Sequence, residues 1–303
     1  MNRLGRLVLV ALAFCGLGLA PDVEGRTLRV LTSFLPVYCF TANVAGDLAT
    51  VENLLPANVE PHDYQFSRKD LQKLSHADLI VVNGVGLESW LSRMFHDAGA
   101  HPKVVEIGAG LGPDLIYAGE GRASSLHPNP HIWLDPRIAC HAITNILSAL
   151  QKADPPNADK YAINANRYVM QLERLDAGLR EAMAPVRGAA IVTYHDAFPY
   201  FARRYGLNIV GVVEPVPDVE PSLKSLAALY RTIRAKRVQA IFTEPPTASR
   251  LARQIGSDLR LPVVELDPLE AGALNTDAYE QAMKNNGRVL LKYLKPDAPE
   301  SLL

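Results

Sequence analysis

Residues 157–184 read NADKYAINANRYVMQLERLDAGLREAMA, contain no proline and have Gly178 as their only glycine. Apolar side chains recur along this stretch at spacings of three and four, the pattern of an amphipathic helix: Tyr161, Ala165, Tyr168, Leu172, Leu175, Leu179 and Met183. One unbroken helix here would be about 40 Å long. Two helices that turn near Gly178 are the alternative, but no proline or turn cluster lies beside that glycine. We therefore predict a single linking helix.

Short β-forming runs alternate with helical patterns on both sides of this helix. They cover residues 28–33, 50–55, 78–83, 103–107, 189–194, 208–213, 239–243 and 262–266. Continuous apolar strands separated by helices are typical of parallel sheets covered on both faces. We therefore predict an α/β fold of two lobes, each with a four-stranded parallel sheet covered by helices, joined by one long rigid helix. The lobes are residues 26–156 and 186–303, with residues 157–185 between them.

The charge balance excludes some classes of partner. The chain has 31 basic and 32 acidic side chains among 303 residues, a formal net charge of -1. This gives no electrostatic reason to expect binding to nucleic acid or to an anionic membrane. We expect a monomer.

Residues 1–25 have the pattern of a secretory signal peptide. Arg3 and Arg6 precede the apolar run LVLVALAFCGLGLA (7–20), and polar residues follow it. The run is too short to cross a bilayer comfortably. The mature protein is therefore expected in the periplasm or otherwise outside the cytoplasm. Phe14 before Cys15 is larger than the small residue usual before a lipidated cysteine, so a lipid anchor is not expected.

Two cysteines remain after the signal segment, Cys39 and Cys140. A disulfide between them is possible in an exported protein, but the sequence does not show whether they come within bonding distance. We expect two buried thiols.

Four polar residues lie in loops that can form one site. His62 follows the second predicted strand, His195 and Asp267 each follow a strand of the second half, and His131 lies in NPHIWLDP (129–136) between two prolines. Ligands in open α/β sheets collect outside the carboxyl ends of the strands. Three imidazoles and one carboxylate form a tetrahedral set suited to zinc first and manganese second. Binding requires neutral imidazoles, so affinity should weaken as pH falls through about 6.5.

Three of the candidates also have possible roles unrelated to metal binding. His62 can be an exposed loop residue, His195 a buried residue bonded to the backbone, and Asp267 a turn or cap residue. The other histidines are expected to be structural or exposed: His76, His96, His101, His127 and His141. Glu60 and Glu244 are possible additional oxygen contacts.

Several motifs together resemble those of the zinc and manganese solute-binding receptors of ABC importers, the cluster A-I family. They are NVEPHDYQFSRKDLQKLSHADLIVVNG (58–84), NPHIWLDP (129–136), VTYHDAFPYFARRYGL (192–207), IFTEPPTASRLARQI (241–255) and VVELDPL (263–269). The resemblance implies two α/β lobes joined by one long helix, with the metal between them. It also implies that His62, His131, His195 and Asp267 are the metal ligands, and that the partner is a membrane permease of an ABC importer.

Two departures from the family pattern bear on the metal. Many zinc-specific members carry a long histidine-rich loop where this chain has the short segment 112–130 with only His127. Manganese and iron members tend to have a glutamate where this chain has His195, so a third imidazole favours zinc.

A secreted zinc hydrolase is the alternative function. Such an enzyme needs an open coordination position for water and a general base, for which Glu244 is the candidate. Four protein ligands would close the coordination shell, and the HExxH signature is missing from the sequence. An adhesin, a third class, has no support in the chain. We therefore expect a binding protein and not an enzyme.

Overall fold

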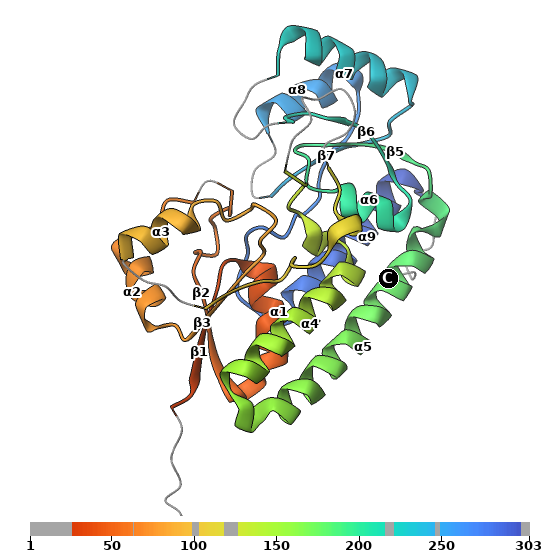
Figure 1. Cartoon of the computed structure of the whole chain (residues 1–303). Helices are drawn as coiled ribbons and strands as arrows, with labels where there is room; N and C mark the ends of the chain where they lie inside the picture. Colours follow the sequence, from red (N-terminus) through yellow and green to blue (C-terminus); the bar gives the residue numbers. More distant parts are fainter. Residues whose placement is uncertain are drawn as a thin grey trace, which may run out of the picture.

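Two parallel four-stranded sheets organise the computed structural model (Figure 1), which describes residues 26–62, 64–98, 103–117, 127–215, 221–245 and 249–297. The first sheet has the order β2-β1-β3-β4, and the second has the order β6-β5-β7-β8. The strands are β1 (Leu28–Thr32), β2 (Ala49–Asn53), β3 (Leu79–Val82), β4 (Val104–Glu106), β5 (Ala190–Thr193), β6 (Asn208–Val212), β7 (Ile241–Thr243) and β8 (Val263–Glu265). Seven of the eight lie within a predicted run, and β2 begins one residue before its run, so the predicted fold class is confirmed.

Helices connect the strands and cover the sheets. In the first half they are α1 (Leu35–Ala45), α2 (Arg68–His76), α3 (Leu91–Ala98) and α4 (Pro136–Ala153). In the second half they are α6 (Pro199–Tyr205), α7 (Leu223–Ala235), α8 (Arg250–Leu259) and α9 (Ala278–Leu294). The described helices include none that is both long and apolar enough to cross a bilayer.

The predicted linking helix is α5 (Ala158–Met183), a single unbroken helix that runs along one side of the molecule in Figure 1. Gly178 lies inside it, so the alternative with a turn at this glycine is wrong. All seven residues of the predicted apolar stripe are buried, because this face packs against α4, α1 and α9. Burial of so many apolar side chains holds the helix firmly against the rest of the protein, and we call α5 the strut.

The C-terminal helix α9 returns to the first lobe. It packs against α5 and α1, and the Tyr279 ring lies 4.8 Å from that of Phe40 in an edge-to-face pair. One apolar core therefore runs from the first sheet through the helices into α6 and α9, while a smaller core lies in the second lobe around Val192, Ile233 and Ile241. The division at residues 156 and 185 stays a prediction, and α9 links its two sides.

A buried ion cluster fixes the second lobe to the strut. Arg204 of α6 donates through two nitrogens to the carboxylate of Asp176 on α5, and its Nε lies 3.8 Å from Asp135 Oδ1. Asp135 and Asp176 are both buried. Because an unpaired buried charge is costly, this cluster resists separation of α6 from α5.

Both cysteines of the described chain are free thiols. Cys39 is buried and its Sγ donates to the Asn275 carbonyl oxygen at 3.2 Å, whereas Cys140 is only partly buried. Burial raises the pKa of Cys39 to about 12 and that of Cys140 to about 11. The prediction of two buried thiols is thus confirmed for Cys39 only. Residues 1–25, with the predicted signal peptide and Cys15, lie outside the described residues.

A candidate metal centre

The NPHIWLDP segment is held from several sides. Trp133 is fully buried, its Nε1 donates to the Pro268 carbonyl at 2.8 Å, and its own carbonyl accepts from the Tyr279 hydroxyl at 2.8 Å. Asp135 caps the start of α4 by accepting from the Arg137 backbone N–H at 2.9 Å. Pro136 suits the first position of a helix because it has no N–H to satisfy. His131 therefore lies in a short, rigid segment between the two lobes.

Two loops at the carboxyl ends of strands place the other two histidines near His131. His62 lies in the loop after β2, where Trp90 Nε1 donates to the Pro61 carbonyl at 2.9 Å. His195 lies two residues after β5. In parallel sheets these ends face the same crevice, which explains why loops distant in sequence meet.

Glu270 arrives from a turn after β8. The Asp267 carboxylate accepts from the Leu269 N–H at 2.7 Å, and Leu269 is buried with a left-handed φ of 62°. This turn directs Glu270 into the crevice. The Gly272 N–H donates to the Ala57 carbonyl at 2.6 Å, which fastens the loop to the first lobe.

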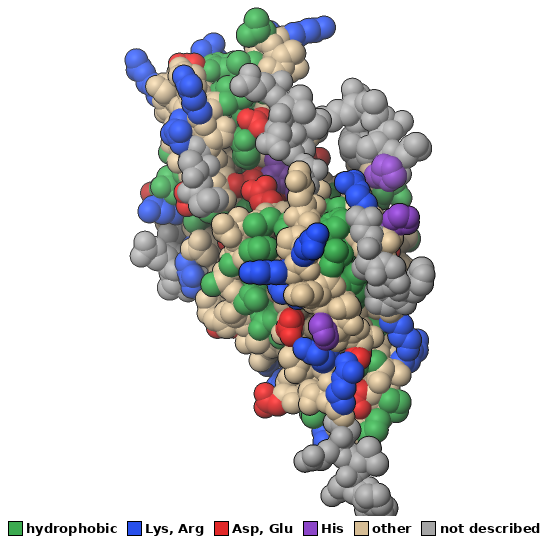
Figure 2. All heavy atoms as spheres, turned by 90° about the vertical axis from the view of Figure 1, so that its left-hand side faces the viewer, with side chains coloured by type: hydrophobic (Ala, Val, Ile, Leu, Met, Phe, Trp, Pro, Cys, Tyr) green, Lys and Arg blue, Asp and Glu red, His purple; other side chains and the backbone are tan. Residues whose placement is uncertain are grey.

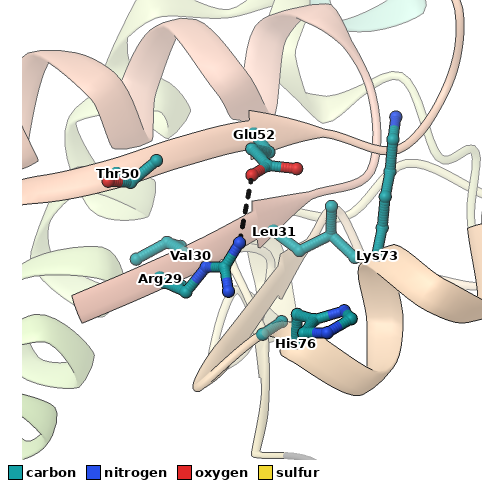
Figure 3. A pocket seen from close by; sticks show the side chains of 8 residues that line it. Arg29, Val30, Leu31, Thr50, Glu52, Lys73 and His76 are labelled. Atoms are coloured by element: carbon teal, nitrogen blue, oxygen red, sulfur yellow. Dashed lines mark ion pairs between the residues drawn. The ribbon is translucent and has the colours of Figure 1, made fainter. Parts of the chain in front are cut away.

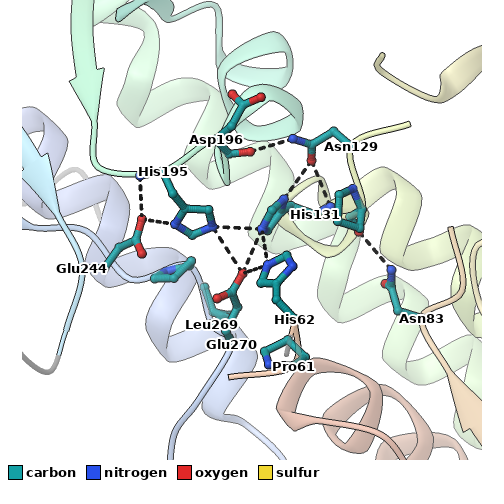
Figure 4. Close-up of polar contacts among 12 residues, drawn as sticks. Pro61, His62, Asn83, Asn129, His131, His195, Asp196, Glu244, Leu269 and Glu270 are labelled. Atoms are coloured by element: carbon teal, nitrogen blue, oxygen red, sulfur yellow. Dashed lines mark hydrogen bonds and ion pairs between the residues drawn. The ribbon is translucent and has the colours of Figure 1, made fainter. Parts of the chain in front are cut away.

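The structure brings His62, His131, His195 and Glu270 together (Figure 4), with one possible ligand atom of each within 4.8 Å of all the others. Glu270 Oε1 lies 3.1 Å from His62 Nε2, 2.8 Å from His131 Nε2 and 3.5 Å from His195 Nε2. His131 Nε2 lies 3.0 Å from His195 Nε2 and 3.2 Å from His62 Nε2. Three of these residues are buried, and His62 is partly exposed.

Outer hydrogen bonds orient two of the imidazoles. His195 Nδ1 lies 2.5 Å from Glu244 Oε1, and His131 Nδ1 lies 2.9 Å from Asn129 Oδ1. Both oxygens accept from Nδ1, and a ring that carries its proton on Nδ1 alone presents the Nε2 lone pair to the shared centre. Three ring nitrogens and a carboxylate oxygen at these separations can be bridged by protons or by one cation. Such outer partners orient metal-binding histidines in proteins generally.

The charges of the cluster also suit a divalent cation. Burial lowers the pKa of His131 to about 4, so this ring is neutral near pH 7. Burial alone would lower the pKa of His195, but its hydrogen bonds to Glu244 and Glu270 raise it to about 10. Burial opposes the charge on Glu270, but bonds from the three histidines hold its pKa well below the usual range. Loss of the His195 proton leaves two carboxylates, which a divalent ion neutralises.

The structure brings Glu270, and not the predicted Asp267, to the three histidines. Asp267 is not one of the four residues whose donor atoms converge, and its side chain instead closes the turn at Leu269. This is the turn role that the sequence left open for Asp267. Glu270, only three residues further on in LDPLEAG, takes the place predicted for Asp267. A second acidic residue just beyond the same strand was the signal that sequence reasoning missed.

The two glutamates considered as extra contacts lie close to the cluster but outside it. Glu244 is hydrogen-bonded to His195 Nδ1, the ring nitrogen that faces away from the cluster. Burial, followed by the nearby carboxylates of Glu270 and Glu244, raises the pKa of Glu60. Figure 2 shows acidic (red) and histidine (purple) side chains gathered in a hollow between the upper and lower parts of the molecule. This hollow is a suitable approach for a cation.

Two of the remaining histidines have ring nitrogens close to backbone carbonyls outside the four-residue cluster. His76 Nδ1 is 2.7 Å from the Gln72 carbonyl within α2, and His141 Nε2 is 2.7 Å from the Ala109 carbonyl. Figure 3 shows His76 beside a shallow crevice where Arg29 and Glu52 form an ion pair at 3.9 Å. His96 and His127 are exposed, and His101 lies outside the described residues.

Comparisons with known proteins show the family of the chain. The family model described as "ZnuA: Zinc-uptake complex component A periplasmic" matches residues 30–293. The chain is similar to the high-affinity zinc uptake system protein ZnuA of Bacillus subtilis, with 33% identity over 258 residues that cover 82% of this chain and 81% of that protein. It is also similar to the zinc-binding protein AdcA of Streptococcus pyogenes serotype M3, with 32% identity over 82% of this chain. The match spans about half (51%) of the length of AdcA.

Solved structures show the same fold. The solute-binding protein FpvC of Pseudomonas aeruginosa, in complex with Ni²⁺, superposes with a TM-score of 0.79 and 27% identity, covering 90% of this chain and 99% of that chain. The predicted resemblance to metal receptors of ABC importers is thereby confirmed. The chain belongs to the family of periplasmic zinc-uptake components named for ZnuA.

Proposed function

We propose that the protein is an extracytoplasmic solute-binding protein that captures a divalent transition metal ion, zinc first and manganese second, and delivers it to an ABC permease. One observation carries this function. Three imidazole nitrogens and one carboxylate oxygen, supplied by distant loops of both halves, converge within 4.8 Å. We propose His62, His131, His195 and Glu270 as the ligands of the transported ion.

The donor atoms favour zinc over manganese. Zinc is bound tetrahedrally by nitrogen, sulfur and oxygen donors, whereas manganese prefers sites richer in oxygen. A set of three imidazoles and one carboxylate is therefore the better match to zinc. Zinc uptake or zinc binding also appears in the names of the similar ZnuA and AdcA proteins.

The geometry supports a receptor and not a hydrolase. Four protein ligands fill a tetrahedral shell, so no position is left for the water that a catalytic zinc activates. Glu244, the candidate general base, bonds His195 Nδ1 at 2.5 Å and so orients a ligand. The family description, too, names a transport component.

Capture and release need a path to the ion. His62 is the partly exposed member of the four, so the ion enters and leaves on its side of the crevice. The α5 strut and the Arg204 cluster restrict large lobe rotations. Release therefore involves movement of the His62 and Glu270 loops with a slight tilt of the lobes.

Location and partners follow from the proposed role. A zinc-uptake receptor works outside the cytoplasm and docks on a membrane permease, and a monomer suffices because one chain supplies all four ligands. The signal peptide predicted at residues 1–25 fits this location. Absence of a lipid anchor rests on Phe14 alone and stays a prediction.

Metal loading tests the assignment. Chelator-treated protein is reloaded with zinc, and its metal content is measured together with competition by manganese. We expect one zinc ion per chain, and loss of most of the affinity in His131→Ala and His195→Ala. The matched control is His76→Ala, which removes an exposed imidazole on α2. Unchanged zinc content in both ligand variants would refute the site, and turnover of ester or phosphate substrates lost in His195→Ala would favour the hydrolase.

A further inference from the structure

Charge is distributed unevenly along the chain. Residues 223–260 contain eight basic and two acidic side chains, a net charge of +6. Because the whole chain has a net charge of -1, the remaining residues together carry a net charge of -7. The nearly neutral total therefore conceals one strongly basic region in the second lobe.

Helices α7 and α8 carry this basic region on the outer face of the second sheet. Ile233 of α7 and Ile255 of α8 pack in the same small core, whereas α6 packs against α5. The Tyr230 hydroxyl of α7 donates to Asp258 Oδ2 of α8 at 2.6 Å, which joins the two helices. Figure 2 shows Lys and Arg side chains (blue) on the upper part of the molecule, where Figure 1 labels α7 and α8. We call the exposed basic residues of these helices and of the turns after them the basic face: Lys224, Arg231, Arg234, Lys236, Arg237, Arg250, Arg253 and Arg260.

Acidic side chains do not balance the basic face. Asp258 is the only acidic residue of α7 and α8, and its two oxygens already accept from the Tyr230 hydroxyl and from Gln254 Nε2. Within the described parts of the chain, Lys224, Arg231 and Arg234 form no ion pair. By contrast, α5 has four acidic and four basic residues. The basic face is therefore a concentrated positive surface that attracts anions.

An exposed leucine lies beside these cations. Leu223, at the start of α7, is 87% exposed. Lys224 and Arg231 are seven residues apart, and Leu223 and Arg234 are eleven apart, which is close to two and three whole helical turns. All four side chains therefore lie on the solvent side of α7. Basic residues around an apolar side chain suit the surface of an anionic bilayer, because the cations meet phosphates and the leucine meets acyl chains.

We propose that the basic face binds anionic phospholipid headgroups of a membrane, with Leu223 entering the bilayer interface. The location rests on the proposed function, since a receptor outside the cytoplasm meets the outer surface of the membrane that holds its permease. Metal capture is separate, because the four candidate ligands lie in the crevice between the lobes. Each Lys or Arg close to an anionic membrane strengthens binding by about fivefold. Weak, reversible binding of this kind keeps the receptor near the permease.

Two variants of α7 test the two parts of the proposal. The triple variant Lys224→Gln/Arg231→Gln/Arg234→Gln removes three exposed charges without touching the buried side of the helix. Leu223→Ser removes the exposed apolar side chain and keeps every charge.

A matched control removes the same number of positive charges elsewhere. Lys152→Gln/Arg174→Gln/Arg180→Gln changes exposed residues of α4 and α5, outside the basic face. Its net charge equals that of the α7 triple variant.

The assay is sedimentation of protein purified after export, with vesicles of phosphatidylcholine alone or of an equimolar mixture with phosphatidylglycerol. We expect wild type to bind only the anionic vesicles, and to bind them more weakly as salt shortens the Debye length from about 10 Å at 0.1 M to about 3 Å at 1 M. Binding should fall about 100-fold in the α7 triple variant and at least about threefold in Leu223→Ser, but stay within about threefold of wild type in the control. Zinc affinity, measured with a chelating dye, should be unchanged in all three variants.

Four outcomes would overturn the proposal: no wild-type binding to anionic vesicles, equal binding to neutral vesicles, unchanged binding in either α7 variant, or an equal loss in the control. The wild-type dependence on lipid charge and salt decides even where a variant does not fold. Cross-linking of α7 to the permease without any vesicle binding would make the basic face a protein docking surface and refute the lipid partner. If wild type binds anionic vesicles as expected but takes up no zinc, the proposed function fails and the membrane contact stands.

Discussion

Replacement of Glu270 by glutamine tests which carboxylate holds the ion. Glu270→Gln keeps the side-chain shape and one oxygen but removes the negative charge at the meeting point of three imidazoles. The matched substitution is Asp267→Asn, which preserves an oxygen acceptor for the Leu269 N–H outside the cluster. The sequence predicted the opposite pattern, with Asp267 as the ligand, so the pair of variants gives a clear decision.

The expected loss follows from the burial of Glu270, which is only 3% exposed. Removal of one partner from a buried charge pair costs about 3–5 kcal/mol. This corresponds to a fall in zinc affinity of about 140- to 3,700-fold, because each 1.4 kcal/mol is a factor of ten. Asp267→Asn should change zinc affinity by less than about threefold, since the turn that directs Glu270 is kept.

The assay is competition between metal-free protein and a chelating dye of known zinc affinity, at fixed pH and ionic strength. Circular dichroism and thermal unfolding of each metal-free variant serve as folding controls. A large loss in Asp267→Asn with near wild-type affinity in Glu270→Gln would refute the assignment. Equal losses in two folded variants would mean that the turn at Asp267 matters as much as the charge of Glu270.

Three further predictions concern pH and stability. Because the pKa of His195 is raised to about 10, zinc must displace the proton of this ring, and the apparent zinc affinity should rise about tenfold per pH unit from 7 to 9. Calorimetry in buffers of different ionisation enthalpy should show about one proton released per zinc ion at pH 8. Zinc binding without proton release would contradict this prediction. Burial raises the pKa of Glu88 from 4.5 to about 7, so the metal-free protein should lose about 3 kcal/mol of unfolding free energy as pH rises from 4.5 through 7. In urea unfolding, Glu88→Gln should lack this pH-dependent loss. The same dependence of unfolding free energy on pH in wild type and Glu88→Gln would contradict the prediction. Arg204→Met leaves two buried aspartates without their arginine and should lower the unfolding free energy by about 3–5 kcal/mol in chemical unfolding. The control Arg203→Met, at an exposed arginine, should lower it by less than about 1 kcal/mol. Equal effects of the two substitutions would contradict the role of the cluster.

The pH prediction also shows what a tertiary environment adds to a residue type. From the sequence alone, metal affinity was expected to weaken through about pH 6.5, the range of an ordinary histidine. In the folded protein Glu244 and Glu270 both bond His195 and stabilise its protonated form. The window of proton competition therefore moves upward, to a range that no single residue type would have indicated.

The periodic elements could be predicted from sequence because local patterns determine them. The apolar stripe from Tyr161 to Met183 specified α5 as one helix, and the eight β-forming runs specified both sheets, since each residue there packs according to the period of its own element. Strand ends also located His62 and His195, because the carboxyl ends of parallel strands open on one crevice.

Only the tertiary structure shows that Glu270, and not Asp267, lies beside the three histidines. Both acidic residues lie just after β8, and the direction of each side chain depends on a turn at Leu269 whose conformation is set by packing against the rest of the molecule. The bond from Asn129 to the Asp196 carbonyl likewise joins segments 67 residues apart. Sequence patterns record which elements form, whereas contacts between loops arise from the way the lobes meet, and they determine which side chains reach the centre.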